Sequence, residues 1–319
     1  MTQATLIYNP VAGRDPARRE QQIRKAADVL HGSGFALAIQ PTLEPGSARR
    51  LAQAAVRAGA DLVIACGGDG TINEVINGLA HEEAALAILP GGTANIAAKE
   101  LGLPQHLVTA ARELPGWQPR RVALGRVTWG EGTAGQSGAA SRPTPAVATP
   151  AARYFLSVAG IGYDAYVVHR LNQGFKSSLG VIAYGWEAVR QVWRYAFPLV
   201  VCRSDDREWR GTFALVQRGE RYAGWLHLAP GATLFDDRLH LCLFESSNPS
   251  RYFAYAAAVL FQRHAALKDV RRVDCDAVAC SAANPGARVY VELDGELAGE
   301  LPARFEIVPG ALTLLTPPA

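Results

Sequence analysis

Two short glycine-rich segments of the chain carry acidic and hydroxyl residues of the kind that handle phosphate. The first is Gly67-Gly68-Asp69-Gly70-Thr71, and the second runs from Leu89 to Asn95 as LPGGTAN. Each follows a short apolar run and precedes residues with helical spacing. Paired glycines would therefore present backbone N–H groups at a helix N-terminus, where an anion is stabilised. We expect both loops to bind nucleotide phosphates.

Asp69 in the first loop predicts a metal ion beside the phosphate. Gly67 and Gly68 permit a tight turn and close approach of a ligand, and Thr71 can cap the following helix and bond a phosphate oxygen. A carboxylate next to phosphate is repulsive unless a cation lies between them, and Mg²⁺ is the usual one. For an isolated loop of this sort, an ordinary turn with a capping residue is the alternative interpretation.

The segments around these loops alternate between strand and helix patterns. Apolar runs predict strands, and apolar residues at i, i+3, i+4 and i+7 predict helices. The pattern gives strands at 4–8, 35–40, 61–66 and 85–89 and helices at 15–31, 46–58, 71–80 and 93–101. Parallel strands place their carboxyl ends at one edge of a sheet, so both loops should open on the same crevice. Residues 1–128 are thus predicted to form a doubly wound α/β nucleotide-binding domain.

The rest of the chain has a different pattern. Residues 129–152 are dominated by Gly, Ala, Ser, Thr and Pro and predict a flexible loop. Beyond it, period-two apolar runs predict a largely antiparallel β domain over residues 153–304. These runs lie at 154–158, 198–202, 212–216, 239–244, 288–293 and 304–308, with helices expected near 176–195 and 250–265.

Composition narrows the class of protein without naming it. A chain of 319 residues exceeds the usual single domain, and its content of 49% hydrophobic and 19% charged residues excludes a disordered chain. A net charge of +3 is too small to indicate a nucleic-acid partner. The 5 cysteines are scattered and odd in number, which indicates neither a disulfide framework nor a zinc site and favours a cytoplasmic location.

No secretory leader is expected, because the chain enters the strand-like run Ala4–Tyr8 almost at once. The longest apolar run, Tyr252–Phe261, is about half the ~20 residues that a membrane-spanning helix needs. Membrane contact would therefore be peripheral, and a buried helix of the second domain is the more ordinary interpretation of this run.

The ordered set of motifs resembles the diacylglycerol kinase catalytic domain, as found in bacterial lipid kinases and in sphingosine and ceramide kinases. GGDGT alone is shared with NAD kinases and phosphofructokinases, whereas the whole set is specific. The resemblance implies a first domain like that of NAD kinase and a β-sandwich whose final strands, near 305–319, return to the first domain. The matching segments are Asn9–Gly13, Gly67–Leu79, Leu89–Pro104, Ser157–Val168, Leu228–Leu241 and Asp294-Gly295-Glu296.

The resemblance also implies roles for individual residues. Asp69 would organise Mg-ATP, and Glu296 would accept the proton of a lipid hydroxyl; as an isolated tripeptide, Asp294-Gly295-Glu296 would more often be a hairpin turn. The ATP contacts carry over to Asn9, Thr42, Gly67, Gly68, Asp69, Gly70, Thr71, Ile72, Asn73, Gly92 and Thr93.

A second, structural Mg²⁺ is implied in the loop before residue 240. Its ligands would be the Asp237 carboxylate and the backbone carbonyls of Leu234 and Leu239. Arg238 stands where the family commonly has glycine, and two acids in an exposed turn are the alternative interpretation. Ile96 is a further departure, since the soluble diacylglycerol kinases often have Asp there, and it leaves the choice of lipid open.

Together these features predict an ATP-dependent lipid kinase that phosphorylates a hydroxyl of a diacylglycerol-like or sphingoid lipid at a membrane surface. A homodimer and peripheral contact with the inner face of the membrane are further expectations. Two alternatives stay open: a kinase of a soluble nucleotide such as NAD, and a non-catalytic lipid-binding regulatory protein. The sequence has no GxSxG or GxxxxGK[ST] motif, so serine-hydrolase and P-loop chemistry are not indicated.

Overall fold

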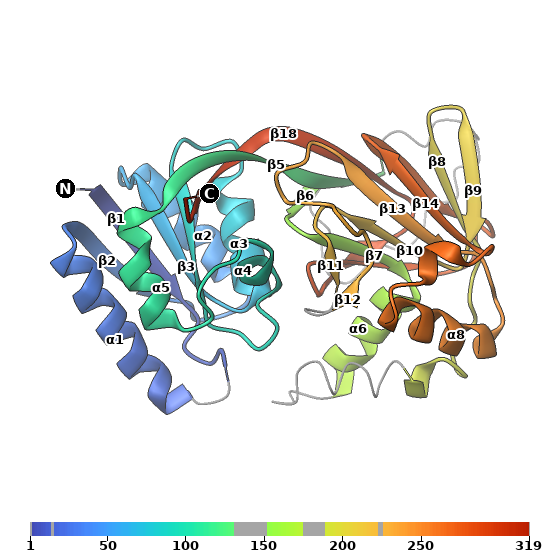
Figure 1. The fold of residues 1–319 in the computed structure, drawn as a ribbon, viewed down its shortest axis with the longest axis horizontal. Helices are drawn as coiled ribbons and strands as arrows, with labels where there is room; N and C mark the ends of the chain where they lie inside the picture. Colours follow the sequence, from blue (N-terminus) through green and yellow to red (C-terminus); the bar gives the residue numbers. More distant parts are fainter. Residues whose placement is uncertain (1, 14–15, 131–151, 175–188, 223–225, 319) are drawn as a thin grey trace.

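The computed structural model describes residues 2–13, 16–130, 152–174, 189–222 and 226–318. Two domains lie side by side, and strands β5 (Gln118–Trp129) and β18 (Ala303–Thr316) run from one to the other along the upper side of Figure 1. The predicted loop at 129–152 and most of the predicted helix at 176–195 lie outside the described residues.

The first domain alternates strands and helices as predicted, and its doubly wound α/β class is confirmed. Its sheet has the parallel order β2-β1-β3-β4, continued by β18. Helix α5 was not predicted. The elements are β1 (Thr2–Tyr8), α1 (Pro16–Gly32), β2 (Phe35–Pro41), α2 (Ser47–Arg57), β3 (Leu62–Gly67), α3 (Asp69–Leu79), β4 (Ala85–Pro90), α4 (Ile96–Glu100) and α5 (Leu107–Glu113).

Burial in the core of this domain explains why the apolar spacing predicted its strands and helices. All residues of β3 are buried, as expected for a central parallel strand covered on both faces. Helix α3 buries the four apolar residues that its spacing predicted, Ile72, Val75, Ile76 and Leu79. Burial of each such side chain contributes about 1.5–3 kcal/mol, so α3 is firmly held against the sheet at the point where its first turn carries Asp69.

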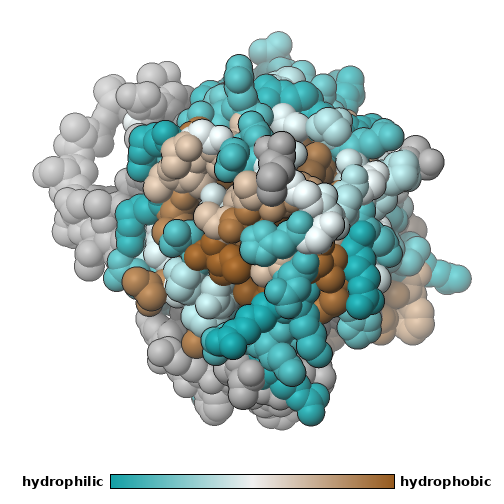
Figure 2. All heavy atoms as spheres, turned by 90° about the vertical axis from the view of Figure 1, so that its left-hand side faces the viewer, coloured by the Kyte–Doolittle hydropathy of each residue, from teal (hydrophilic) through white to brown (hydrophobic). Residues whose placement is uncertain are grey.

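Strand β2 is the outer strand of the sheet and is only partly covered. Ala38 and Ile39 are exposed, and a shallow groove beside the strand is lined by apolar residues including Leu37 and Ala55. Figure 2 looks onto this side of the molecule, where apolar side chains gather in a hollow between hydrophilic ones. An open edge of this kind can accept another chain. The homodimer expected from the sequence stays a prediction.

The second domain is a β-sandwich, as predicted. One sheet has the antiparallel order β14-β13-β10-β7-β16-β17, and it packs against β5, β18, β15 and β8 through a shared apolar core. Its elements are β6 (Ala152–Phe155), β7 (Val158–Gly162), α6 (Tyr163–Gly174), β8 (Val200–Ser204), β9 (Arg207–Gly211), β10 (Phe213–Gln217), β11 (Arg221–Tyr222), β12 (Leu226–His227), β13 (Leu239–Phe244), α8 (Pro249–Leu260), β14 (Val270–Cys275), β15 (Ala277–Ala282), β16 (Tyr290–Leu293) and β17 (Glu296–Glu300).

Strand β18 belongs to both domains. Its first residues pair antiparallel with β15, whereas Leu314 near its end pairs parallel with Leu86 of β4. Strand β5 accompanies it from Thr316 back to Ala303. One sheet therefore extends from β2 in the first domain to β9 in the second. The boundaries set at residues 128 and 304 stay predictions, since a single strand serves both halves.

Candidate active site between the two domains

The four parallel strands end at one edge of the sheet. Tyr8 is level with Pro41 of β2 and Cys66 of β3, and Gly67 is level with Pro90 of β4. Backbone hydrogen bonds fix the loops that follow, because the Asn9 amide donates to the Cys66 carbonyl (3.0 Å) and the Thr42 amide donates to the Tyr8 carbonyl (2.8 Å). The predicted phosphate-handling segments thus share one edge.

The two glycine loops touch each other. A Cβ on Gly92 would lie 2.5 Å from the Cα of Gly68, so this close approach excludes a side chain. Helix α3 begins at Asp69 with Gly68 as its N-cap, and the prediction that Thr71 caps it is wrong. The Thr71 hydroxyl instead accepts a hydrogen bond of 3.5 Å from Asn9 Nδ2.

The second loop differs from the prediction in its length. Asn95 takes a left-handed φ of 49°, and its side chain accepts a hydrogen bond of 2.8 Å from the Gly92 amide. This turn delays the start of α4 to Ile96, three residues after the predicted start at Thr93, which is exposed. A side chain that folds back onto the backbone competes with helix formation.

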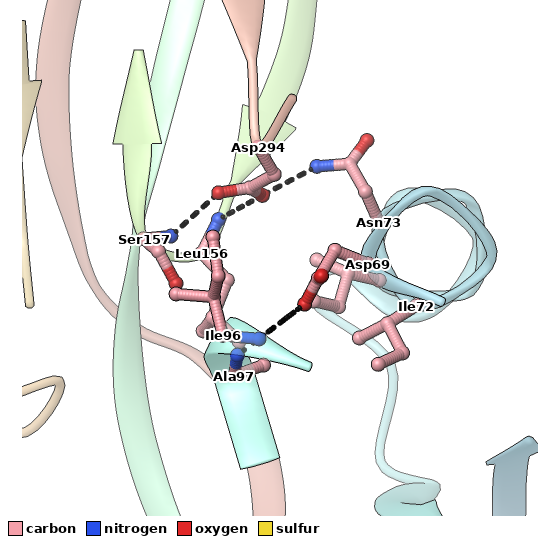
Figure 3. A pocket seen from close by; sticks show the side chains of 9 residues that line it. Asp69, Ile72, Asn73, Ile96, Ala97, Leu156, Ser157 and Asp294 are labelled. Carbon is pink, nitrogen blue, oxygen red and sulfur yellow. Dashed lines mark hydrogen bonds between the residues drawn. The ribbon is translucent and has the colours of Figure 1, made fainter. Parts of the chain in front are cut away.

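Asp69 ties the two loops together. Its Oδ1 accepts hydrogen bonds from the backbone amides of Ile96 (2.8 Å) and Ala97 (3.4 Å) (Figure 3). Burial raises the pKa of this carboxyl to about 6 against the effect of the Ala97 amide, and the charge of Asp294 raises it further. Ile96 therefore takes part in the site through its backbone amide.

A hairpin turn carries Glu296 to the first glycine loop. Asp294 and Gly295 link β16 to β17 with φ values of 48° and 89°, which is the geometry of a two-residue turn with both central residues left-handed. The turn places the Glu296 carboxylate directly against Gly70, where an added Cβ would collide with Oε1. Residues 294–296 thus form a hairpin turn and also place a carboxylate at the crevice, so the two interpretations do not exclude each other. Glu296 lies at the first turn of α3.

The Glu296 carboxylate is accessible but partly desolvated. The Glu296 side chain is 43% exposed, and its Oε2 lies 3.9 Å from Arg153 Nη2. Desolvation raises the pKa of Glu296; the Arg153 charge opposes this effect, and the charges of Glu74 and Asp294 add to it.

Asp294 joins the domains. Its Oδ1 accepts from the amides of Ser157 (2.8 Å) and Val158 (3.0 Å), and its Oδ2 accepts from the Leu156 amide (2.8 Å) and from Asn73 Nδ2 (2.8 Å). Figure 3 shows this carboxylate between α3 and the start of β7, on the wall of a small pocket that Asp69 and Ser157 also line. The acid before Gly295 therefore holds the hairpin in place.

Asn73 has a structural task that the sequence did not indicate. Its side chain is 1% exposed, donates to the Tyr154 carbonyl (3.1 Å) as well as to Asp294, and accepts from Arg153 Nη2 (3.2 Å). Ile72 is likewise buried in the core of the first domain. The nucleotide contacts assigned to both residues stay predictions.

Two arginines near the loops were missed because nothing in their sequence surroundings marks them. Arg153 lies in β6 beside Glu296. Arg19 is 5% exposed within α1, and its guanidinium lies directly against Gly91, with Nη2 3.5 Å from the Cys66 sulfur. Both bring positive charge toward the edge where the strands end.

A buried acid pair behind the hairpin was also missed. Glu292 Oε2 accepts from the Gly295 amide (2.6 Å), and Asp164 accepts from the Tyr222 hydroxyl (2.5 Å). Burial raises the pKa of Glu292 strongly, and the neighbouring Asp164 adds to this effect. Glu292 thus supports the turn that carries Glu296 through its hydrogen bond with the Gly295 amide.

The three implied ligands of the structural Mg²⁺ have mixed surroundings. The Leu234 carbonyl accepts a hydrogen bond of 2.7 Å from Arg218 Nη2. The Asp237 side chain is exposed, and Leu239 is the first residue of β13, paired with Cys275. One implied ligand is therefore already bound to a cation of the protein, and another faces solvent.

Comparison with known families agrees with this architecture. A family described as the diacylglycerol kinase catalytic domain matches residues 3–127, and one described as the YegS C-terminal NAD kinase beta sandwich-like domain matches residues 157–316. The chain belongs to the diacylglycerol kinase family. It is accordingly a lipid kinase, and membership of a kinase family implies that it uses ATP.

Relatives of this lipid kinase match along most of its length. A diacylglycerol kinase from Bacillus subtilis is 26% identical over 310 residues, covering 96% of this chain and 93% of that protein. A probable lipid kinase YegS-like from Chromohalobacter salexigens is 32% identical over 228 residues, 70% of this chain and 66% of that protein. A putative diacylglycerol kinase from Bacillus anthracis has the same fold, with a TM-score of 0.74 at 24% identity over 99% of this chain and 97% of that one.

Proposed function

We propose that the enzyme transfers the terminal phosphate of ATP to a hydroxyl of a diacylglycerol-like or sphingoid lipid, with Glu296 as general base and Asp69 organising Mg-ATP. The observation that supports this most directly is the contact between the Glu296 carboxylate and Gly70, which brings a base to the start of the helix that carries Asp69. These residues are more than 200 positions apart in the sequence, and a hairpin shaped by a fixed turn brings them together.

Phosphoryl transfer demands positioning and charge stabilisation more than covalent chemistry. The paired loops after β3 and β4 would hold the phosphates, with Asn9 and Thr42 at the same edge. Asp69 fits the role of a Mg²⁺ ligand, because Mg²⁺ in kinases is commonly held by one or two carboxylates together with substrate phosphates. When bound, Mg²⁺ would offset charge on the phosphate oxygens. Arg153 and Arg19 would add positive charge from two further elements.

Glu296 is suited to accept a proton. Its carboxylate is partly exposed, so an incoming hydroxyl could reach it, and its raised pKa brings it closer to the working pH of a general base. The positive charge of Arg153 beside it favours the ionised form of the carboxylate.

The test compares the wild-type enzyme with Glu296→Gln, using labelled ATP, Mg²⁺ and mixed micelles of diacylglycerol, sphingosine, ceramide and, separately, NAD. We expect lipid turnover to fall by about 10²–10⁴-fold while ATP affinity changes little, because Gln keeps the shape but cannot accept the proton. Glu300→Gln is the matched control, since Glu300 lies on the same strand but pairs with Arg288. Equal activity of Glu296→Gln and wild type would remove Glu296 from the mechanism, and phosphorylation of NAD alone would favour a soluble nucleotide kinase.

We also propose that α8 and the segment before β8 contact the surface of an anionic bilayer. Trp193, Phe253, Leu260 and Phe261 are 64%, 42%, 49% and 71% exposed, and the Trp193 and Phe253 rings lie 6.0 Å apart. Exposed arginines at positions 190, 194 and 263 accompany them. Aromatic and apolar residues with a basic rim favour an anionic lipid surface. Among the described residues, no helix has the length and apolar character needed to cross a bilayer.

Vesicle sedimentation tests this surface. The double variant Leu260→Ser, Phe261→Ser should bind phosphatidylglycerol vesicles about tenfold more weakly, because two apolar side chains no longer enter the lipid. Leu43→Ser is the control, since Leu43 is 88% exposed on the first domain. Unchanged binding of the double variant would place the membrane contact elsewhere.

A further inference from the structure

The loop before β13 contains a buried cation that belongs to the protein. Arg218, the residue after β10, is 0% exposed. Its guanidinium donates to three backbone carbonyls: Nη1 to Leu156 (3.1 Å) and Nη2 to Leu234 (2.7 Å) and Asp236 (3.3 Å). A buried charge is stable only when it is well satisfied, so these oxygens and the nearby carboxylates of Asp236, Asp237 and Asp294 together hold a positive group here.

We propose that Arg218 takes the place of the structural divalent ion that the family resemblance implies at Leu234, Asp237 and Leu239. The Leu234 carbonyl, which would be a metal ligand, binds the guanidinium instead, and the Asp237 side chain is exposed. These residues do not fit a Mg²⁺ site while Arg218 is present.

Arg218 is connected to the hairpin at residues 294–295 through the segment that both contact. Its backbone amide donates to the Ser157 carbonyl (2.8 Å), and its side chain holds the Leu156 carbonyl, while Asp294 accepts from the amides of the same two residues. Arg218 therefore binds the carbonyls of Leu156 and Ser157, and Asp294 binds their amides. Arg218 is a positioning residue for the turn that carries Glu296, and this last role depends on the proposed function of Glu296.

Metal content and thermal unfolding test the replacement without any assay of turnover. Wild-type protein dialysed against EDTA, then equilibrated with millimolar Mg²⁺ and desalted, should hold far less than one equivalent of divalent metal. Its Tm, without nucleotide, should be the same in EDTA and in millimolar Mg²⁺. One equivalent of retained metal, or a Tm that rises by several degrees with Mg²⁺, would overturn the proposal.

Substitution provides the second arm of the test. Arg218→Ala should lower the Tm by about 5 °C or more, because three buried carbonyls lose their donor. Mg²⁺ should restore part of this loss, since the opened space is lined by carbonyl oxygens with carboxylates close by. A Tm that does not fall, or a loss that Mg²⁺ does not restore, would overturn the idea that the guanidinium occupies a metal position. Arg238→Ala, an exposed arginine of the same loop, should leave the Tm unchanged in both conditions. If Arg218→Ala does not fold, the wild-type measurements decide.

Discussion

The domain joint around Asp294 and the crevice around Asp69 and Glu296 use carboxylates in opposite ways. Asp294 is 9% exposed and accepts four hydrogen bonds from the protein. Glu296, two residues later, keeps 43% of its side-chain exposure and has Arg153 at 3.9 Å. A carboxylate that builds the fold is saturated by internal donors. The carboxylate that we propose serves the reaction keeps oxygens within reach of a proton, a metal or a substrate.

The largest expected effect tests the joint. Asp294→Ala should lower the free energy of unfolding by about 3–5 kcal/mol, because buried amides of residues 156–158 lose their acceptor and alanine disfavours a left-handed φ. Urea unfolding followed by circular dichroism measures it. Asp294→Asn keeps an acceptor oxygen and tolerates the backbone angle, so its loss should be smaller. An alanine variant as stable as the wild type would contradict the structural role of the Asp294 carboxylate.

A methyl group at Gly70 tests the crevice. Gly70→Ala places a Cβ where the Glu296 carboxylate lies, and the displaced base should cost about 100-fold in kcat with little change in Tm. Steady-state kinetics with the preferred lipid measures this loss. Gly32→Ala is the control, since a Cβ at Gly32 meets no atom within 4 Å. Normal kcat in Gly70→Ala would show that the observed contact does not matter for turnover.

The pH dependence should distinguish the working acids. Asp69, with a pKa raised to about 6, must be ionised to hold a cation, and Glu296, whose pKa is also raised, must be ionised to accept a proton. The ionised fraction of Asp69 falls as pH drops through about 6, so kcat/KM should decline below about pH 6 by about tenfold per pH unit, and more steeply where Glu296 also becomes protonated. A flat profile down to pH 5 would contradict both assignments.

The stability contributed by Asp69 should change with pH in the opposite direction to activity, falling as pH rises. The folded-state pKa of Asp69 lies above its ordinary value of 3.8, so its contribution to stability is lost as pH rises through about 6. Asp69→Asn keeps the acceptor oxygen for Ile96 and avoids the buried charge. It should therefore be inactive yet more stable than wild type at pH 8, with the difference closing near pH 4.

The strands, the glycine loops and the shared edge could be predicted because they depend on local patterns. The run before Gly67 is uniformly apolar, and the residues after it repeat with helical spacing. Glu296 could be placed only through resemblance, since an Asp-Gly pair predicts just a turn. That turn is present, and the sequence says nothing of which helix it faces.

The residues that the sequence did not reveal act through contacts between distant elements. Asn73 looked like part of a phosphate loop, yet its side chain bonds Asp294 and the Tyr154 carbonyl across the domain joint. Arg218 follows an ordinary strand, and only its burial against residues 234–236 shows it to be a cation site. The predicted start of α4 is three residues too early because the Asn95 side chain accepts a hydrogen bond from the Gly92 amide.

The shared strand β18 has a practical consequence for dissecting the protein. A fragment ending after β5 would keep both glycine loops but lose the partner of both β4 and β5. Its newly bared sheet edge would invite self-association. The first domain therefore cannot be separated as an independent fragment, and biochemical dissection has to proceed by point substitution in the intact chain.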